Sequence, residues 1–570
     1  MNTSPLPRSI VALALALAPP ATLSAAQDLE PTPIVLAPDA LVHGEAKDAY
    51  FTLIDTGDID GDGIQDLVVA WYPRPTRFAY QAAVILGRPD WPALAGVSGL
   101  SDVHTLGLPL VDNLSPNAPD YTMGALLDAN GDGLDDVVVR KDERQAGYPK
   151  AREARVYFGK PGWGAIDVTK DAPDLLVRQA RVPWTPREAE RYQMPDTFYA
   201  GDFNGDGRQD LAIGSCGVTD PDLADGSTDV HLYLAPEGGL QRIDLGTTKP
   251  DAVIRAPSAG TLAVQLGCGA FAGNADDLNG DGSSDLVLRA WKSGTTGTRS
   301  YLVFGRPEWP ADAELVAVAD VAMERGGNNP GARAWQIEDI SGDGHRDLVV
   351  DYFDAHGEAQ CVLFSGRAFR PEEDLSDCDL RVVDRPIWMA GDVDGDGARD
   401  LLIPWEPPSI WLPPSEWRVV RGPFAPGGEV AIGKSSGQGD YVLRVPERSE
   451  IEGAVGWWFE DVSGDGRDDA LLGTWNADSP TGVSRAGTVA IHVGPLVAGP
   501  PAPSPTASPT ATSAPSPTAT PSLEATPDEP TATEASGTAT TTARATVEAP
   551  TWTPTVPTTA GRIYLPIGYR

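Results

Sequence analysis

One nine-residue acidic pattern occurs seven times in this chain of 570 residues, and it constrains the fold more than any other feature. Each copy reads Asp-x-[Asp/Asn/Ser]-Gly-Asp-Gly-x-x-Asp and leads directly into a short apolar run such as Leu67-Val68-Val69. Seven copies in one phase with their flanking runs indicate a repeat architecture whose units share a metal chemistry. The copies begin 70, 74, 75, 62, 53 and 69 residues apart, at Asp58, Asp128, Asp202, Asp277, Asp339, Asp392 and Asp461.

The residue types in this pattern are those that calcium requires. Calcium takes about six to eight oxygen ligands in an adaptable geometry. Alternate residues of a tight loop point inward, so positions 1, 3 and 5 supply side-chain oxygens, position 7 supplies its carbonyl and position 9 adds a carboxylate. The glycines at positions 4 and 6 allow backbone angles that a β-carbon would penalise. Position 3 varies only among oxygen donors, which ligation predicts and general acidity does not.

We therefore expect up to seven Ca²⁺ sites, each formed by one copy of the pattern. The candidate ligands, at positions 1, 3, 5, 7 and 9 of each copy, are Asp58, Asp60, Asp62, Ile64 and Asp66; Asp128, Asn130, Asp132, Leu134 and Asp136; Asp202, Asn204, Asp206, Arg208 and Asp210; Asp277, Asn279, Asp281, Ser283 and Asp285; Asp339, Ser341, Asp343, His345 and Asp347; Asp392, Asp394, Asp396, Ala398 and Asp400; and Asp461, Ser463, Asp465, Arg467 and Asp469.

The pattern has two other interpretations. An EF-hand begins similarly but needs a bidentate Glu at position 12 and flanking helices. Position 12 is an apolar strand residue in every copy, such as Val69 or Leu472, so the EF-hand interpretation fails. The second interpretation is a set of metal-free turns, because Asp, Asn and Gly favour turns in any case. It stays open, above all for the copies with serine at position 3.

Within each repeat the apolar residues recur at a period near two, and glycine or proline interrupts every run, as in short β-strands. A second run ends near a glycine, as in 84–87, 156–159 and 302–305. Small sheets repeated radially form a β-propeller. The expected fold is therefore all-β, a seven-bladed β-propeller. We further expect the segment before the first loop to add a strand to the last blade and so close the ring.

The acidic loop followed by a Phe-Gly strand resembles the FG-GAP repeat of integrin α-subunit propellers, and it is similar to the VCBS repeats of secreted bacterial proteins. The resemblance covers residues 45–497. It implies calcium sites in the blade hairpins, commonly on the face opposite the ligand-binding loops. Integrin leg domains and a transmembrane helix are not visible in the sequence, so integrin-type ligand binding is not carried over.

The two ends of the chain differ from the repeats. Residues 1–26 have the charge, apolar stretch and small-residue cleavage site of a secretory signal peptide. The propeller is expected over 27–498, a disordered stalk rich in Pro, Thr and Ser over 499–560, and a short apolar tag over 561–570. We expect a secreted, monomeric protein, held at the cell surface if the tag acts as an anchor.

The net charge limits the classes of partner that the chain can bind, and the cysteine count bears on its disulfides. A net charge of −38 argues against nucleic acid and anionic membranes as partners, even after calcium offsets part of it. Four cysteines in an exported chain favour disulfides, and we prefer Cys216–Cys268 and Cys361–Cys378 because each pair lies in one repeat or in adjoining repeats. Free buried thiols are the alternative.

No catalytic constellation or organic cofactor site is apparent. The stretch 428–435 matches the phosphate-loop pattern, but no buried strand and helix flank it. Tryptophans at a fixed phase after the loops (Trp71, Trp291, Trp405 and Trp475), and those after Gly-[Arg/Lys]-Pro-x (Trp91, Trp163 and Trp309), are interpreted as inter-blade packing. The less regular Trp411 and Trp417 are weaker candidates to line a ligand site.

The expected function is binding, as an adhesion or ligand-binding module for an extracellular protein or glycan. A lectin, a polysaccharide lyase or hydrolase built on a propeller, and a purely structural surface protein are the alternatives. The insertions at 141–155 and 164–198 are the first places to look for the ligand site.

Overall fold

A computed structural model describes the blades and most of their connections. The described residues are 33–71, 81–106, 120–145, 148–179, 197–214, 229–245, 247–255, 262–266, 272–292, 298–324, 333–354, 357–405, 416–432, 439–444, 455–474 and 477–497. The expected signal peptide, stalk, C-terminal tag and Cys216–Cys268 pair lie outside these ranges, as do Trp411 and Trp475.

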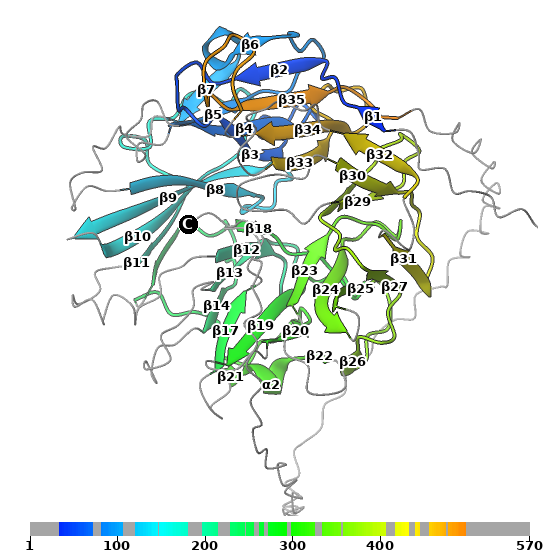
Figure 1. The fold of residues 1–570 in the computed structure, drawn as a ribbon. Coiled ribbons are helices and arrows are strands. Elements are labelled where there is room, and N and C mark those ends of the chain that lie inside the picture. Colours follow the sequence, from blue (N-terminus) through cyan, green and yellow to red (C-terminus); the bar gives the residue numbers. More distant parts are fainter. Residues whose placement is uncertain are drawn as a thin grey trace, which may run out of the picture. The chain divides into compact units, whose positions relative to one another are not determined.

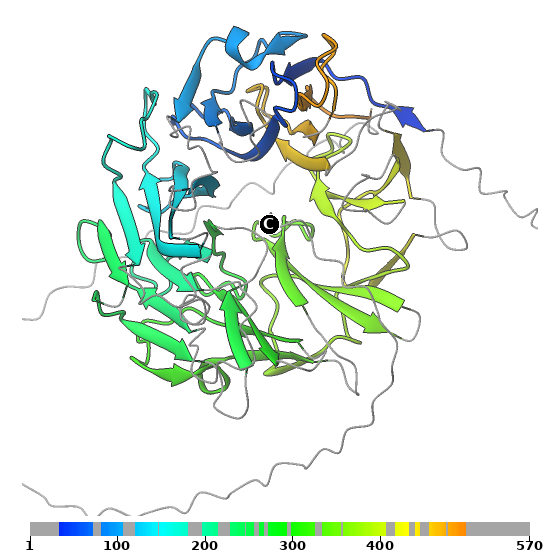
Figure 2. The ribbon, with the colours of Figure 1, turned by 60° about the vertical axis from the view of Figure 1, so that its left-hand side comes forward.

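Seven antiparallel sheets of four main strands form a ring, which confirms the expected seven-bladed β-propeller (Figures 1 and 2). Each repeat loop joins the first strand of its blade to the second. Blades 1 to 4 are built as follows: blade 1 from β3 (Thr52–Gly57), β4 (Asp66–Trp71), β5 (Gln81–Ile85) and β7 (Val103–Leu106); blade 2 from β8 (Asp120–Leu127), β9 (Asp136–Gln145), β10 (Tyr148–Tyr157) and β11 (Leu175–Gln179); blade 3 from β12 (Thr197–Gly201), β13 (Asp210–Gly214), β14 (Val230–Tyr233) and β16 (Ala252–Arg255); and blade 4 from β17 (Leu262–Leu266), β19 (Leu286–Lys292), β20 (Thr298–Val303) and β22 (Val321–Glu324).

The last blade takes its fourth strand from the N-terminal part of the chain. The remaining blades are blade 5 from β23 (Arg333–Ile337), β24 (Asp347–Asp354), β25 (Gly357–Leu363) and β27 (Leu380–Val383); blade 6 from β28 (Met389–Gly391), β29 (Asp400–Pro404), β30 (Glu416–Val420) and β32 (Tyr441–Arg444); and blade 7 from β33 (Val455–Glu460), β34 (Asp469–Thr474), β35 (Thr488–His492) and β2 (Ala40–His43). The antiparallel pairing of β2 with β35 confirms the predicted ring closure.

Short parallel strands link neighbouring blades at the outer edge of the ring. The connection between the third and fourth strands of one blade pairs with the outer strand of the blade before it. These edge strands are β6 (Ala95–Gly96) on blade 7, β15 (Arg242–Leu245) on blade 2, β21 (Ala313–Glu314) on blade 3, β26 (Glu372–Asp374) on blade 4 and β31 (Gly428–Ala431) on blade 5, while Ile166 forms a single bridge to Leu106 of blade 1.

Blade 6 receives its edge strand from the other end of the chain, since β1 (Ile34–Val35) pairs in parallel with β32. Blade 3 carries an additional inner strand, β18 (Ala272–Asn274). Among the described residues the only helical elements are α2 (Leu315–Val318) and the 3-10 turn η1 (Val97–Gly99).

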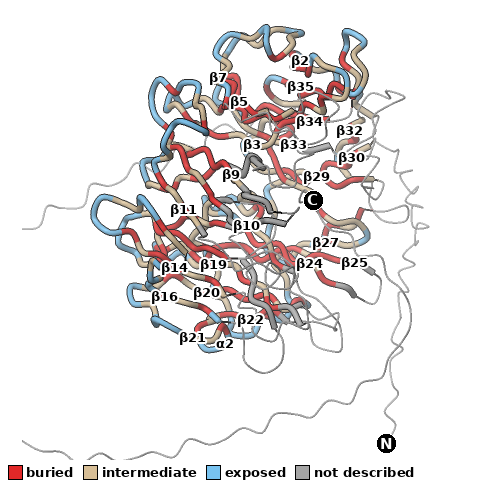
Figure 3. Tube along the Cα trace, turned by 90° about the vertical axis from the view of Figure 1, so that its left-hand side faces the viewer, coloured by how far each residue is buried: buried red, intermediate tan, exposed pale blue. Residues whose placement is uncertain are grey.

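The hydrophobic core is divided into seven clusters, one between each pair of neighbouring blades. Strand β4 shows why. Leu67 and Val69 pack against blade 7, whereas Val68 and Ala70 pack against blade 2, because successive side chains of a strand point to opposite faces. The blade strands are consequently buried while the surrounding turns are exposed (Figure 3).

Two expectations about local structure change. Residues 141–155, expected as an insertion loop, are largely β-structure, because β9 and β10 continue as a long hairpin that pairs Asp142 with Arg152. Of 164–198, residues 175–179 form β11 and 180–196 lie outside the described residues.

Cys361 and Cys378 form the predicted disulfide within blade 5, with their Cα atoms 5.3 Å apart.

Candidate metal centres

The seven acidic loops lie at the same end of their blades, because each connects a first strand to a second strand. They are numbered in chain order: loop 1 (58–66), loop 2 (128–136), loop 3 (202–210), loop 4 (277–285), loop 5 (339–347), loop 6 (392–400) and loop 7 (461–469). The connections from second to third strand, and from fourth strand to the next blade, leave from the opposite face of the ring.

The first aspartate of each loop organises the turn. In all seven loops its Oδ2 accepts the N–H of the glycine at position 6, at 2.7–3.0 Å. All fourteen glycines at positions 4 and 6 have φ between 72° and 97°, in the left-handed region that other residues avoid. The backbone therefore requires glycine at these two positions, as predicted.

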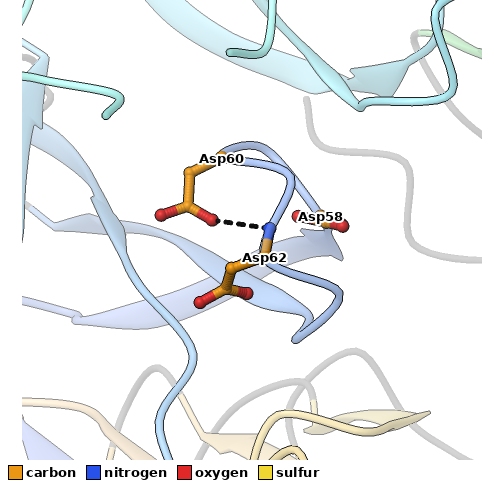
Figure 4. Close-up of side chains that lie close together, drawn as sticks. All are labelled: Asp58, Asp60 and Asp62. Carbon is orange, nitrogen blue, oxygen red and sulfur yellow. Dashed lines mark hydrogen bonds between the residues drawn. The ribbon is translucent and has the colours of Figure 1, made fainter. Parts of the chain in front are cut away.

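In loops 1 and 6 the carboxylates at positions 1, 3 and 5 lie close together. In loop 1, Asp58, Asp60 and Asp62 offer oxygens that lie within 4.8 Å of one another, and Asp392, Asp394 and Asp396 do the same in loop 6. Figure 4 shows the first group, in which Asp60 Oδ1 accepts the N–H of Asp62 at 3.2 Å. An all-oxygen set of this kind suits a hard divalent cation.

The loops with asparagine at position 3 are arranged differently. In each of them the amide nitrogen donates a hydrogen bond to the carboxylate at position 5, at 2.9–3.0 Å. The amide must turn before its oxygen can face an ion. The residues concerned are Asn130, Asn204 and Asn279.

The aspartate at position 9 is buried in every loop, at most 1% exposed. Its Oδ1 accepts the N–H of the second residue after the third strand, as Gly87 donates to Asp66 at 2.8 Å, and its Oδ2 accepts an N–H from the start of its own loop. Burial raises the pKa of Asp66 to about 7 and the pKa of Asp136 and Asp285 to about 8. A cation beside such a carboxylate would hold it in the charged form, so the buried position 9 fits a metal ion.

Hydrogen bonds join the loops of neighbouring blades. In loops 1, 2 and 4 the N–H at position 8 donates to the carbonyl at position 1 of the preceding loop, as Asp135 does to Asp58 at 2.9 Å. The N–H of Lys160 likewise donates to the carbonyl of Ile59, at position 2, at 2.8 Å. The position 1 and position 2 carbonyls therefore tie each of these loops to the next blade.

Two of the recurring tryptophans strengthen this link. The indole N–H of Trp309 donates to the carbonyl of Phe203 at 2.9 Å, and Trp91 reaches Val462 in the same way at 3.0 Å. Arg306 lies over the ring of Trp309, 5.2 Å from its centroid. Inter-blade packing, as predicted for these residues, is confirmed.

Four other tryptophans also belong to blade contacts. Trp71 and Trp405 pack against inter-blade clusters, and Trp163 is buried in the cluster between blades 1 and 2. Trp417 does not line a ligand site, because it is fully buried between blades 6 and 7, with its ring centroid 6.1 Å from that of Trp457. The side chain of Trp291 lies outside the described part of the structure.

Sequence reasoning missed several side chains that contact the loop carboxylates, among them Ser365 at Asp343, Tyr441 at Asp394, and Arg421. Arg421 pairs with Asp394 and Asp396 of loop 6. A signal for Arg421 was available in the sequence. The equivalent position is apolar in the other six blades, as at Leu86 and Phe158, and only this blade has a charged residue there.

Comparisons with known proteins were made for the whole chain. No family model matches it. Integrin alpha pat-2 of Caenorhabditis briggsae is 26% identical over 245 residues, 42% of this chain and 18% of that protein. Integrin alpha-PS2 of Drosophila melanogaster is 28% identical over 173 residues, 29% of this chain and 12% of that protein. The matched region thus spans less than a fifth of the length of these relatives.

Two solved structures show a distant likeness. Rhamnogalacturonan lyase YesW aligns with a TM-score of 0.34 and 12% identity over 81% of this chain and 75% of its own. The endosialidase of phage phi92 aligns with a TM-score of 0.27 and 9% identity over 80% of this chain and 69% of its own. Scores this low support no activity for this chain. The integrin similarity together with the seven blades confirms the expected resemblance to integrin α propellers.

Proposed function

From the premise that this chain carries an integrin α-like propeller, we propose that it is a calcium-binding adhesion or ligand-binding module. The observation that carries the proposal is the construction of the loops. Each has oxygen-bearing side chains at positions 1, 3 and 5, which converge in loops 1 and 6, and a buried carboxylate at position 9 that accepts an N–H from just beyond the third strand. Calcium is the divalent cation best matched to such an adaptable all-oxygen set.

In this proposal calcium acts on stability and shape. The ion offsets the repulsion between the aspartates of one loop and keeps the position 9 carboxylate charged. Because position 1 and position 2 carbonyls bind the following blade, an ordered loop also holds two blades together. The loop face then serves as a rigid base for binding elsewhere on the ring.

We place ligand binding on the opposite face, where the connections between second and third strands lie. The β9–β10 hairpin supports this choice, since its two strands have ten residues each, against eight in β8 and five in β11. Exposed loops and hairpins on a rigid scaffold are where binding residues concentrate. An extracellular protein or a glycan is the proposed partner.

The proposed location is outside the cell, by export and with retention at the surface through the C-terminal tag. Within the described residues no helix is long and apolar enough to cross a bilayer. A release assay in cells with and without residues 561–570 tests the retention, since the truncated chain is expected in the medium.

The function is tested by binding the full-length protein to arrays of extracellular-matrix proteins and glycans, with calcium and after its removal. We expect calcium-dependent binding to a restricted set of ligands. Multivalent binding confined to glycans would instead identify a lectin, and depolymerisation of a bound polysaccharide would identify an enzyme. Absence of any ligand in both conditions would contradict the binding function.

A hairpin variant locates the binding face. Replacing residues 143–151 with Asn-Gly keeps the Asp142–Arg152 pair and closes the shortened hairpin with a favoured two-residue turn. The matched control places Asn-Gly at positions 355–356, between the paired residues Asp354 and Gly357 of β24 and β25. Loss of ligand binding in the first variant alone, with unchanged calcium binding in both, supports ligand binding on the face that carries the β9–β10 hairpin.

A further inference from the structure

Loop 6 differs from the other loops through a residue of its own blade. Arg421 stands directly before Gly422, whose N–H donates to Asp400 Oδ1 at 2.9 Å. The corresponding residue in every other blade is uncharged and apolar. These residues are Leu86, Phe158, Leu234, Phe304, Phe364 and Val493.

The guanidinium of Arg421 contacts two of the carboxylates that would bind the ion. Its Nε donates to Asp394 Oδ2, and a terminal nitrogen donates to Asp396 Oδ2 at 2.8 Å. The Asp394 side chain is fully buried, while 28% of the Arg421 side chain is exposed. The arginine therefore closes the open side of the loop and reaches inward to the buried carboxylate.

Loop 1 provides the natural comparison. It has aspartate at positions 1, 3, 5 and 9, as loop 6 does, and in both loops oxygens of the first three side chains lie within 4.8 Å of one another. One difference is that Leu86 stands where loop 6 has Arg421, and another is that the hydroxyl of Tyr441 donates to Asp394 Oδ2 at 3.3 Å in loop 6. Loop 1 consequently keeps four carboxylates without this positive charge.

A second arginine near a loop behaves differently. Arg208, at position 7 of loop 3, pairs with Asp206, but its Nε donates to the carbonyl of Ala235 at 2.9 Å. Its side chain is 45% exposed. It thus contacts a carboxylate from the rim, whereas Arg421 bridges two carboxylates, one of which is buried.

We propose that Arg421 is a built-in cation that takes the place of calcium in loop 6, so that this blade is closed without metal. The inference rests on the proposed calcium binding of the other loops. A guanidinium fork suits two carboxylate oxygens, and its charge repels a divalent ion approaching the same oxygens. Asp394 Oδ1 has no hydrogen-bond partner, so the carboxylate retains an oxygen for an ion once the arginine is removed.

The test counts bound calcium in the full-length protein by equilibrium dialysis and metal analysis. Arg421→Leu gives loop 6 the leucine that accompanies loop 1. This variant is expected to bind one more Ca²⁺ per chain than the wild type. The reciprocal change, Leu86→Arg, is expected to bind one fewer. Unchanged stoichiometry in Arg421→Leu would overturn the inference, as would unchanged stoichiometry in Leu86→Arg if the first variant did not fold.

Thermal unfolding of metal-free protein gives a second, independent result. Arg421→Leu should melt at a lower temperature than the wild type without metal and recover when calcium is added, because the four carboxylates have lost their counter-charge. An equal loss of melting temperature with and without calcium would contradict the proposal that Arg421 takes the place of the metal ion. Failure of the wild type to bind any calcium would contradict the proposed function, while a single ion gained by Arg421→Leu would still support this inference.

Discussion

The backbone N–H of Gln65 in blade 1 donates a hydrogen bond to the carbonyl oxygen of Asp461 in blade 7, at 2.9 Å. This contact links the first acidic loop to the last. The ring is therefore closed at two places, by these loops at one end of the blades and by the β2–β35 pairing within the seventh sheet.

Ring closure predicts that β2 is essential for the stability of the whole ring. Val42 is 1% exposed and packs between blades 7 and 1, so Val42→Asp places an unpaired charge in the core. We expect a loss of about 3–5 kcal/mol in the free energy of unfolding, measured in urea. Deletion of residues 27–50 should have a larger effect, because it leaves the edge of blade 7 unpaired.

The control for this prediction is Val35→Asp on the adjoining edge strand, where the valine is 60% exposed. It should change the unfolding free energy little. If Val42→Asp were as stable as this control, β2 would not be holding the ring together.

The hydrogen bonding of two tryptophans near the loops predicts different losses of unfolding free energy for their replacement by phenylalanine. Trp309→Phe removes an indole hydrogen bond to Phe203 but keeps an aromatic ring, and should cost about 1 kcal/mol. Trp163→Phe should cost less, because the buried Trp163 N–H has no hydrogen-bond partner to lose. Unfolding of both variants under the same conditions checks the difference, and an equal cost would argue against the inter-blade bond.

The disulfide in blade 5 predicts a measurable effect of reduction. Its cysteines are 17 residues apart, and closing a loop of that length in the unfolded chain stabilises the fold by about 3 kcal/mol. The double variant Cys361→Ser, Cys378→Ser should therefore unfold at lower denaturant, and reducing agent should no longer affect this blade. A variant as stable as the oxidised wild type would contradict the prediction.

Asp55 predicts a pH dependence that does not involve the loop ligands. Its Oδ2 accepts the N–H of Leu126 in blade 2 at 2.9 Å, and burial raises its pKa to about 6 from an ordinary 3.8. The folded state therefore binds a proton more tightly than the unfolded state does, so this group's contribution to stability falls as pH rises from 3.8 to about 6. Asp55→Asn removes that dependence.

The measurement for Asp55 compares wild type and Asp55→Asn in urea between pH 4 and 7, at a fixed calcium concentration. The difference in unfolding free energy between the two should change across this range in favour of the variant at higher pH. A difference that is constant with pH would show that Asp55 does not titrate in this way.

The repeat allowed much of the fold to be predicted from sequence. Seven copies with glycines at positions 4 and 6 specify the turns, and the period of two before and after them specifies the strands, so the blades and the closing strand β2 were all expected. The Cys361–Cys378 pair followed from proximity within one repeat.

The parts that were not predicted lack such a local signal. The edge strands β1, β6 and β21 are two residues long and depend on a partner in another blade. The β9–β10 extension is rich in charged residues and lacks the alternation that marks a strand packed on a core. The contact of Arg421 with Asp394 joins residues 27 apart in sequence, and no pattern of spacing indicates it.

Calorimetry of the full-length protein with calcium and with EDTA tests the central claim most directly. At ~1 mM calcium and a site Kd of ~0.1 mM, each loaded loop would stabilise the fold by about 1.4 kcal/mol. Six such loops would contribute about 8 kcal/mol, which is an upper bound because the blades are coupled. We expect EDTA to lower the Tm by on the order of 10 °C. A metal-free protein that melts within a degree or two of the calcium form would contradict the assignment of these loops as calcium sites.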